Sequence, residues 1–322
     1  MSAEEERGGA PVGARPGAWL GERAERPAVE RGGRVRSIAV LTHGRQQETA
    51  AALARLLERA RAAGVTLRVD AEEALKHGLV AAPGVEVDAV SERGDGGAEV
   101  EEALCVVLGG DGTILRALRR YAGTDVPVFA VNFGEIGFLA TVEPEELEDG
   151  IRRALSGDFE LLRLPAIVLE TPSGEETAIN DVAIHRRVGE RVARLAYELD
   201  GEEVGSVRCD GLVIATPAGS TGYNLANGGP VMAWGVKGFV VSFIAPHSLT
   251  ARALVAAPGD RITIHNRSRE ALDVAVDGRP VCELAAGGTI AARFVDAVGT
   301  IAQLPGSSFY RRLREKFGRL AR

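Results

Sequence analysis

One stretch decides the fold: Val106–Val107–Leu108–Gly109–Gly110–Asp111–Gly112–Thr113–Ile114–Leu115. The apolar run that ends at Leu108 predicts a buried strand, and the apolar positions after Thr113 predict a helix. The glycines between them let backbone N–H groups approach an anion, and a helix start adds partial positive charge. The corner therefore predicts a phosphate site. Asp111 is placed there to hold a metal ion or to accept a proton from a hydroxyl group.

The same corner also fits an ordinary turn in which Asp111 only caps the helix. It is not a Walker A loop, because no Gly-Lys-Ser/Thr follows the glycines. It is not an ordinary dinucleotide fingerprint either, since no third glycine follows Gly112 at the required spacing. The turn alone leaves the phosphate-site and the structural interpretations open.

Length and composition predict a globular chain with a sizeable core. The chain has 322 residues, 45% of them hydrophobic, and a formal net charge of −7. This charge, without a long basic run before the C-terminal end, argues against nucleic acid or a membrane surface as partner. No transmembrane run or apolar signal core is present in the sequence. Cys105, Cys209 and Cys282 form no C-x-x-C pair, so we expect a reducing, cytoplasmic location.

The pattern of elements changes near residue 160. Before it, strands alternate with amphipathic helices, such as one predicted over Gln46–Ala63 with Gly64 as its cap. This alternation predicts an α/β domain with a Rossmann-like parallel sheet over residues 35–160. Short strands separated by turns then predict an all-β domain over residues 161–300.

The two ends differ from the rest of the chain. Residues 1–34 are rich in Gly, Pro, Arg and Glu and are expected to be a disordered leader. Residues 301–322 are expected to form a tail helix that packs back on the first domain. The helical pattern over Phe309–Phe317 is basic, which is typical of a solvated face.

Polar, glycine-rich stretches follow several predicted strands. Asn132–Leu139 lies just beyond a strand, at the edge where open α/β sheets bind ligands, although a turn with a core Phe138 also fits. Asn180–Asp181 sets an amide beside an acid, which can hold two edges of a polar ligand. Small residues over Thr216–Asn224 leave N–H and hydroxyl donors open for phosphate or ribose. Ser220 has no G-x-S-x-G frame, so nothing marks a hydrolase triad.

Taken together, these motifs resemble the NAD kinase family from about residue 36 to the tail helix. The GGDGT turn is shared with lipid kinases and phosphofructokinases, but the run after Pro217 separates this chain from both. The motifs that carry the resemblance are Gly109–Thr113, Asn132–Leu139, Asn180–Asp181, Asp210 with Thr216–Tyr223, Gly228–Pro230 and Pro246–Arg252.

The resemblance implies a fold and an activity. The fold is a phosphofructokinase-like α/β domain and a β-rich NAD-binding domain, with the active site in the cleft between them. The activity is transfer of a phosphate from ATP or polyphosphate, with Mg²⁺, to the 2′-hydroxyl of the adenosine ribose of NAD, giving NADP. The family also implies a homodimer or homotetramer in which a neighbouring subunit touches the ligand.

The resemblance further implies roles for single residues. Asp111 matches the proton acceptor and, with Gly112, borders NAD. Leu115 and Phe138 match the apolar walls around adenine. The other positions that match NAD- or phosphate-contacting residues are Arg116, Asn180, Asp181, Arg191, Arg208, Asp210, Thr221, Gly222, Tyr223, Asn224, Leu225, Ala226 and Arg279.

Several positions depart from the family's usual pattern, which bears on the preference between NAD and NADH: Ala218, Gly222, Ala226, Ala253 and Arg279. Two alternatives remain at this point. A lipid or sphingoid kinase of the same superfamily would carry a Gly-Thr-Gly-Asn-Asp-type motif, which this sequence lacks. A non-catalytic NAD(P)-binding sensor would have no use for Asp111 as a base. The sequence leaves the choice of donor and the metal ligands open.

Overall fold

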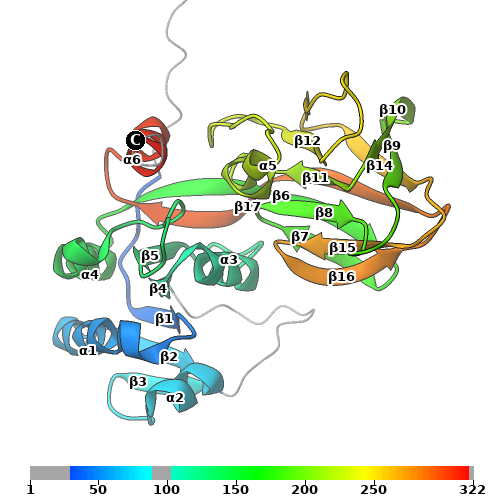
Figure 1. Cartoon of the computed structure of the whole chain (residues 1–322). Coiled ribbons are helices and arrows are strands. Elements are labelled where there is room, and N and C mark those ends of the chain that lie inside the picture. Colours follow the sequence, from blue (N-terminus) through cyan, green and yellow to red (C-terminus); the bar gives the residue numbers. More distant parts are fainter. Residues whose placement is uncertain (1–29, 89–102, 319–322) are drawn as a thin grey trace, which may run out of the picture.

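The computed structural model describes residues 30–88 and 103–318. An α/β unit is followed by a β-rich unit, and two long strands, β6 and β17, run side by side through both (Figure 1). The elements before residue 160 are β1 (Ser37–Thr42), α1 (Gln46–Ala63), β2 (Thr66–Asp70), α2 (Ala71–His77), β3 (Val85–Asp88), β4 (Leu104–Gly109), α3 (Asp111–Arg120), β5 (Val128–Asn132), the 3₁₀ turn η1 (Pro144–Glu146) and α4 (Leu147–Ser156).

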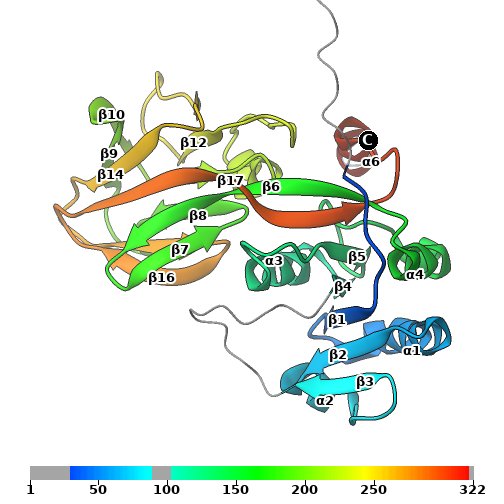
Figure 2. The same ribbon diagram turned by 180° about the vertical axis from the view of Figure 1, so that it is seen from behind.

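The α/β unit has a parallel sheet in the order β3-β2-β1-β4-β5. Strands β4 and β5 are buried throughout, as expected for parallel strands covered on both faces. Helices α1 and α4 lie side by side, as the views in Figures 1 and 2 agree. The predicted helix Gln46–Ala63 is confirmed. Gly64 ends it at φ 67° and donates its N–H to the carbonyls of Ala60 and Arg61.

The β-rich unit contains mostly antiparallel strands. Its elements are β6 (Glu160–Thr171), β7 (Gly174–Ala178), β8 (Asp181–His185), β9 (Ala193–Leu199), β10 (Glu202–Cys209), β11 (Gly211–Ala215), the 3₁₀ turn η2 (Gly219–Thr221), α5 (Tyr223–Ala226), β12 (Phe239–Ile244), β13 (Leu254–Ala256), β14 (Arg261–Asn266), β15 (Leu272–Val276), β16 (Arg279–Leu284) and β17 (Thr289–Gln303). A last helix, α6 (Phe309–Phe317), follows.

Two sheets enclose the core of the β-rich unit. One is antiparallel, in the order β13-β12-β11-β8-β15-β16. The other runs β10-β9-β14-β17 and continues through the parallel pairing of β17 with β5 into the α/β unit. The predicted class, α/β followed by all-β, is confirmed. The sequence did not predict that the two units share a sheet. The 15-residue β17 is long enough to pair in both units, and it continues past residue 300 to Gln303.

The predictions for the two ends of the chain compare differently with the structure. Most of the predicted leader, residues 1–29, lies outside the described residues. Next to it, Gly32 donates its N–H to the carbonyl of Phe159. Helix α6 does not present only a solvated face, since Phe309, Leu313 and Phe317 pack against the core of the α/β unit. In the part of the chain that the structure describes, no helix is both long and apolar enough to cross a membrane.

Candidate active site

The GGDG turn lies at the carboxyl edge of the parallel sheet. Strands β4 and β5 pair in register, and their last residues, Gly109 and Asn132, are partners. The turns that follow the two strands touch through backbone, since a Cβ added to Gly134 would lie 2.7 Å from the Cα of Gly110. Any side chain there would force the two turns apart. The glycines therefore bring the start of α3 against the loop after β5.

Asp111 is the first residue of α3, and its carboxylate is bound by that loop. One oxygen accepts the N–H of Phe138 at 3.0 Å, and the other accepts the N–H of Leu139 at 2.9 Å. The residue at the N-cap position of α3 is Gly110, and no side chain caps the helix. The alternative in which Asp111 only caps its own helix is therefore wrong. The two bonds fix the orientation of the carboxylate, and each oxygen keeps a second lone pair for a ligand.

A second polar corner forms where β8 begins. The carboxylate of Asp277, in the turn between β15 and β16, accepts the N–H groups of Ile179, Asn180 and Asp181 at 3.2, 2.7 and 3.2 Å. It also pairs with Nη1 of Arg119 at 3.1 Å, and its own side chain is 0% exposed. Because Arg119 belongs to α3, this ion pair joins the helix that starts at Asp111 to the Asn180–Asp181 corner.

Asp181 lies in that corner with a perturbed carboxyl group. Burial, reinforced by the neighbouring charge of Asp277, raises the pKa of Asp181 to about 7. Among the described residues, no cation pairs with its carboxylate. Beside it, Oδ1 of Asn180 is buried and has no hydrogen-bond partner in the described part of the chain. The corner therefore presents one acceptor in need of a donor and one carboxyl group that titrates near neutral pH.

The loop after β11 covers this corner. A Cβ added to Gly219 would lie 2.0 Å from the carbonyl oxygen of Asn180, so this position requires glycine. A Cβ added to Gly222 would lie 4.0 Å from both Asn180 Nδ2 and Asp181 Oδ2. Tyr223 follows, and burial first, then the charges of Asp181 and Asp210, raises its pKa. The structure thus brings together most of the second-half residues selected from the sequence.

Two of the selected side chains bond to the backbone of this loop. Asn224 is fully buried, and its Nδ2 donates to the carbonyls of Ser220 and Pro230 at 2.9 and 3.0 Å. Thr221 likewise donates its hydroxyl to the carbonyl of Ala218 at 3.1 Å. Both side chains hold the loop in shape. Leu225 and Ala226 follow in the single turn of α5.

The predicted basic contacts are dispersed. Nη2 of Arg116 bonds to the buried carboxylate of Glu73 at 3.0 Å, so it is already paired. Arg191 and Arg208 are exposed, and their side chains contact no partner in residues 30–88 and 103–318. Arg279 is exposed at the start of β16, and its Nη2 lies 3.8 Å from Oε2 of Glu176.

The remaining predicted residues are an ion-paired aspartate and two apolar residues that pack together. Asp210 pairs with Arg186 at 2.6 Å, and this bond lowers the pKa of Asp210. Leu115 and Phe138 come together in one apolar cluster beside the turn. The ring of Phe138 is 4% exposed, and the edge-to-face neighbours that cover it include Trp234 at 5.8 Å and Phe309 at 5.9 Å.

Comparison with known proteins identifies the family. A model of the ATP-NAD kinase N-terminal domain matches residues 38–159, and one of the ATP-NAD kinase C-terminal domain matches residues 179–295. The chain belongs to the NAD kinase family. A relative named NAD kinase from Gemmatimonas aurantiaca is 38% identical over 222 residues, which cover 66% of this chain and 76% of the relative. Another, from Bifidobacterium longum subsp. infantis, is 32% identical and covers 88% and 82% of the two chains.

Solved structures agree with this assignment. An NAD kinase from Archaeoglobus fulgidus in complex with ATP is similar with a TM-score of 0.64 and 25% identity, covering 88% of this chain and 98% of that one. Yeast NADH kinase complexed with NADH shares the fold with a TM-score of 0.75 at 22% identity, covering 88% of each chain. The lipid-kinase alternative is excluded by the family assignment.

The sequence interpretation missed residues that support this kinase site. Asp277 precedes Gly278, a pair that locally indicates only a turn and suits the positive φ of 46° found for Asp277. Arg119 and Glu73 lie in amphipathic helices, where charged positions predict solvent exposure. Only long-range packing reveals that Arg119 contacts Asp277 and that Glu73 holds Arg116.

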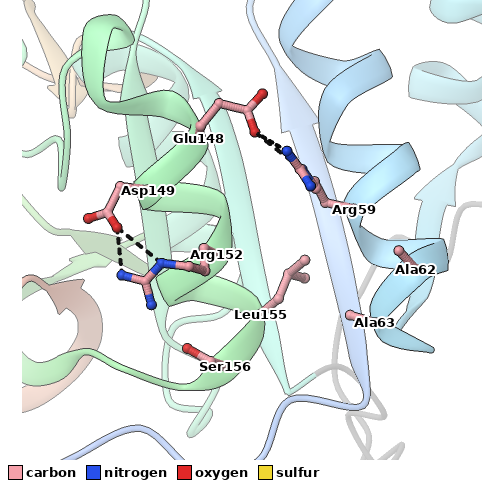
Figure 3. Close-up of a pocket in the computed structure, with 8 residues that line it drawn as sticks. All are labelled: Arg59, Ala62, Ala63, Glu148, Asp149, Arg152, Leu155 and Ser156. Carbon is pink, nitrogen blue, oxygen red and sulfur yellow. Dashed lines mark hydrogen bonds and ion pairs between the residues drawn. The ribbon is translucent and has the colours of Figure 1, made fainter.

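A groove between α1 and α4 is a different feature. Its volume is about 640 Å³, and Figure 3 shows its charged side chains turned toward one another. Arg59 pairs with Glu148 at 2.9 Å, and Arg152 pairs with Asp149 at 2.5 Å. No residue of the GGDG turn or of the Asn180–Asp181 corner lines it, so this groove is not part of the kinase site.

Proposed function

We propose that the protein transfers the γ-phosphoryl group of ATP to the 2′-hydroxyl of the adenosine ribose of NAD, with Asp111 as the general base. One observation carries this proposal. At the carboxyl edge of β4 and β5, the Asp111 carboxylate is held by two N–H groups at the start of a helix. A ligand phosphate is attracted to that helix start, and a hydroxyl beside it meets an oriented acceptor.

The chemistry follows from these positions. The ribose 2′-oxygen forms a bond to the γ-phosphorus, while the bond from that phosphorus to the bridging oxygen of ADP breaks. The hydroxyl proton passes to an Asp111 oxygen, and ADP leaves. A ribose hydroxyl is a poor nucleophile, so alignment with the γ-phosphate and charge neutralisation supply most of the rate enhancement.

The Asn180–Asp181 corner is proposed to hold the adenosine half of NAD. The unpaired Oδ1 of Asn180 accepts a hydrogen bond, and the carboxyl group of Asp181 accepts or donates according to pH. Tyr223 and Gly222 border this corner. The exposed guanidinium groups of Arg191 and Arg208 remain available for phosphate oxygens.

Magnesium is proposed to arrive with the nucleotide. Across residues 30–88 and 103–318, no group of three or more His, Cys, Asp or Glu side chains could hold a metal ion. When bound with the nucleotide, Mg²⁺ would neutralise phosphate charge and would need only one or two carboxylates from the protein. MgATP is therefore the proposed substrate. The ATP complex of the Archaeoglobus fulgidus relative supports ATP as donor.

Location and assembly are also proposals. Cys105, Cys209 and Cys282 form no disulfide within the described residues, and Cys105 and Cys209 are buried, which suits a reducing cytoplasm. A homodimer or homotetramer is proposed from the family resemblance. Mass measurement in solution with and without NAD tests the assembly.

The test of the proposal is a comparison of the wild-type protein with Asp111→Asn. We expect the wild type to form NADP from NAD and MgATP, read by an NADP-specific dehydrogenase. Asp111→Asn should bind NAD with similar affinity and lose turnover by ~10²–10⁴-fold, the range for a general base. Parallel reactions with polyphosphate as donor and NADH as acceptor define the preferences. Unchanged turnover in Asp111→Asn would place the base elsewhere, and NAD binding without wild-type turnover would support a sensor.

A further inference from the structure

The segment from Phe138 to Ala140 is held from two sides. On one side, the N–H groups of Phe138 and Leu139 donate to the carboxylate of Asp111. On the other side, Nη1 of Arg312 in the tail helix donates to the carbonyl of Phe138 at 2.9 Å and to that of Ala140. One short run of backbone therefore links a side chain of α6 to the proposed base.

Arg312 is not a surface arginine. Its guanidinium carbon lies 5.4 Å from the ring centre of Trp234, a position that favours a cation–π interaction. Burial lowers the pKa of Arg312, whereas the nearby negative charges of Asp111 and Glu143 raise it. An arginine nevertheless remains charged in proteins. The side chain thus places a permanent positive charge behind the loop that carries the two donors.

The rest of α6 fixes Arg312 in this place. Phe309, Leu313 and Phe317 share the packed face of the helix, since they are spaced at four and eight residues, and Arg312 follows Phe309 by three residues. The rings of Phe309 and Phe317 lie 5.9 and 5.8 Å from the ring of Phe138. Lys316, also on this side, pairs with Glu143.

The ion pair of Lys316 with Glu143 is connected by a further hydrogen bond to Asn132, the last residue of β5. The second carboxylate oxygen of Glu143 accepts Nδ2 of Asn132 at 2.9 Å, and Oδ1 of Asn132 accepts the N–H of Gly134 at 3.0 Å. The tail helix therefore holds the loop between Asn132 and Glu143 at two places. The Lys316–Glu143–Asn132 chain connects it to the two ends of the loop, and Arg312 binds the middle.

We infer that Arg312 is a positioning residue for phosphoryl transfer: it fixes the 138–140 backbone so that its N–H groups aim the Asp111 carboxylate at the acceptor hydroxyl. The inference rests on the proposed role of Asp111. The guanidinium of Arg312 binds the carbonyls of Phe138 and Ala140, so its loss is expected to act through the loop. The effect is expected on turnover rather than on the affinity for ATP.

The test compares Arg312→Gln with Arg311→Gln. The two arginines are adjacent in α6, and either change removes one positive charge. Arg311 is exposed, and its side chain makes no hydrogen bond or ion pair with the described residues. We expect Arg312→Gln to lose kcat by ~10²-fold at saturating NAD and MgATP, as a misplaced catalytic group does. KM for ATP should change less than threefold, and Arg311→Gln should match the wild type.

Two further measurements separate positioning from a general loss of structure. Hydrogen exchange of the peptide that contains Phe138 and Leu139 should speed up in Arg312→Gln. A soluble guanidinium compound added to Arg312→Ala should restore part of kcat. If Arg312→Gln does not fold, Arg312→Lys decides, because the shorter lysine keeps the charge but cannot place its nitrogen at both carbonyls. About a tenfold loss of kcat is then expected.

A folded Arg312→Gln or Arg312→Lys protein with wild-type kcat and unchanged exchange overturns the inference. Asp111→Asn, assayed beside it, separates this failure from that of the proposed function. If Asp111→Asn is inactive while Arg312→Gln is fully active, only the role of Arg312 falls. If Asp111→Asn is itself active, the proposed base is wrong and the inference falls with it.

Discussion

Two aspartates at the two halves of the site have opposite surroundings. The carboxylate of Asp111 accepts two backbone N–H groups and lies at the start of a helix. The carboxylate of Asp181 is buried next to that of Asp277 and has no ion-pair partner among the described residues, so its pKa rises to about 7. The same residue type is thus given a fixed orientation in the turn and an adjustable protonation state in the corner.

The difference shows that neighbouring groups give the two aspartates different roles in the site. Asp277 takes three N–H groups and Arg119, which leaves Asp181 without donors of its own. A corner with unmet hydrogen-bonding capacity is suited to bind a polar ligand. A carboxylate already aimed by its backbone is suited to react with that ligand. The predictions below test this division.

The largest effect is expected at Asp277, on which the corner depends. Asp277→Ala removes the acceptor of three N–H groups and leaves Arg119 without its buried partner, so unfolding free energy should fall by about 3–5 kcal/mol. Urea denaturation measures it. The matched control is Asp125→Ala, since Asp125 is 95% exposed and pairs with Arg163 at the surface. That control should change stability by less than ~1 kcal/mol. Equal losses in both variants would contradict the role of Asp277.

Paired glycine substitutions separate the two halves kinetically. Gly134→Ala presses on the backbone of Gly110 in the turn and should lower kcat. Gly219→Ala presses on the carbonyl of Asn180 in the corner and should raise KM for NAD, each by roughly tenfold or more. Gly259→Ala, at a position where a Cβ meets nothing within 4 Å, is the control. The division fails if both substitutions change the same kinetic constant to the same extent.

The titration of Asp181 predicts a smaller, pH-dependent effect. Its pKa is raised from 3.8 to about 7 in the folded protein, so the stability that its protonated form contributes is lost as pH rises through that range. Compared with Asp181→Asn, the wild type should lose stability between about pH 4 and pH 7. Chemical denaturation at both pH values tests this. A stability difference between the two proteins that does not change with pH would show that Asp181 does not titrate there.

How much of this the sequence predicts depends on the range of the contacts. The GGDG turn, the helix Gln46–Ala63 and the order of α/β and all-β parts follow from local pattern, and they are confirmed. The binding of Asp111 to the loop at Phe138 and Leu139 spans 27 and 28 residues. Such a contact exists only after β4 and β5 have paired.

The residues that the sequence could not place are those whose charge is buried by distant elements. Asp277 contacts Arg119 across 158 residues, and Arg312 contacts Phe138 across 174. In the sequence, each arginine belongs to a helix with basic residues, a pattern that is typical of exposed surfaces. Their burial follows from how α3 meets the β-rich unit and how α6 returns to the α/β unit.

The smallest effect is expected at Arg279, one of the predicted ligand contacts. Its side chain is exposed, and its ion pair with Glu176 is long, at 3.8 Å. Arg279→Gln should therefore change stability by less than ~0.5 kcal/mol. Any change should fall on the ratio of KM values for NAD and NADH, with kcat unchanged. Steady-state kinetics with both dinucleotides measure it, and a fall in kcat would connect Arg279 to the Asp111 half instead.

The most direct test of the central claim is a crystal structure of the wild-type protein with NAD bound. We expect the 2′-oxygen of the adenosine ribose to lie ~2.6–3.2 Å from a carboxylate oxygen of Asp111, as a general base requires. The adenosine should then lie against the Asn180–Asp181 corner. A ribose whose 2′-oxygen is beyond hydrogen-bond reach of Asp111 in every subunit would contradict it.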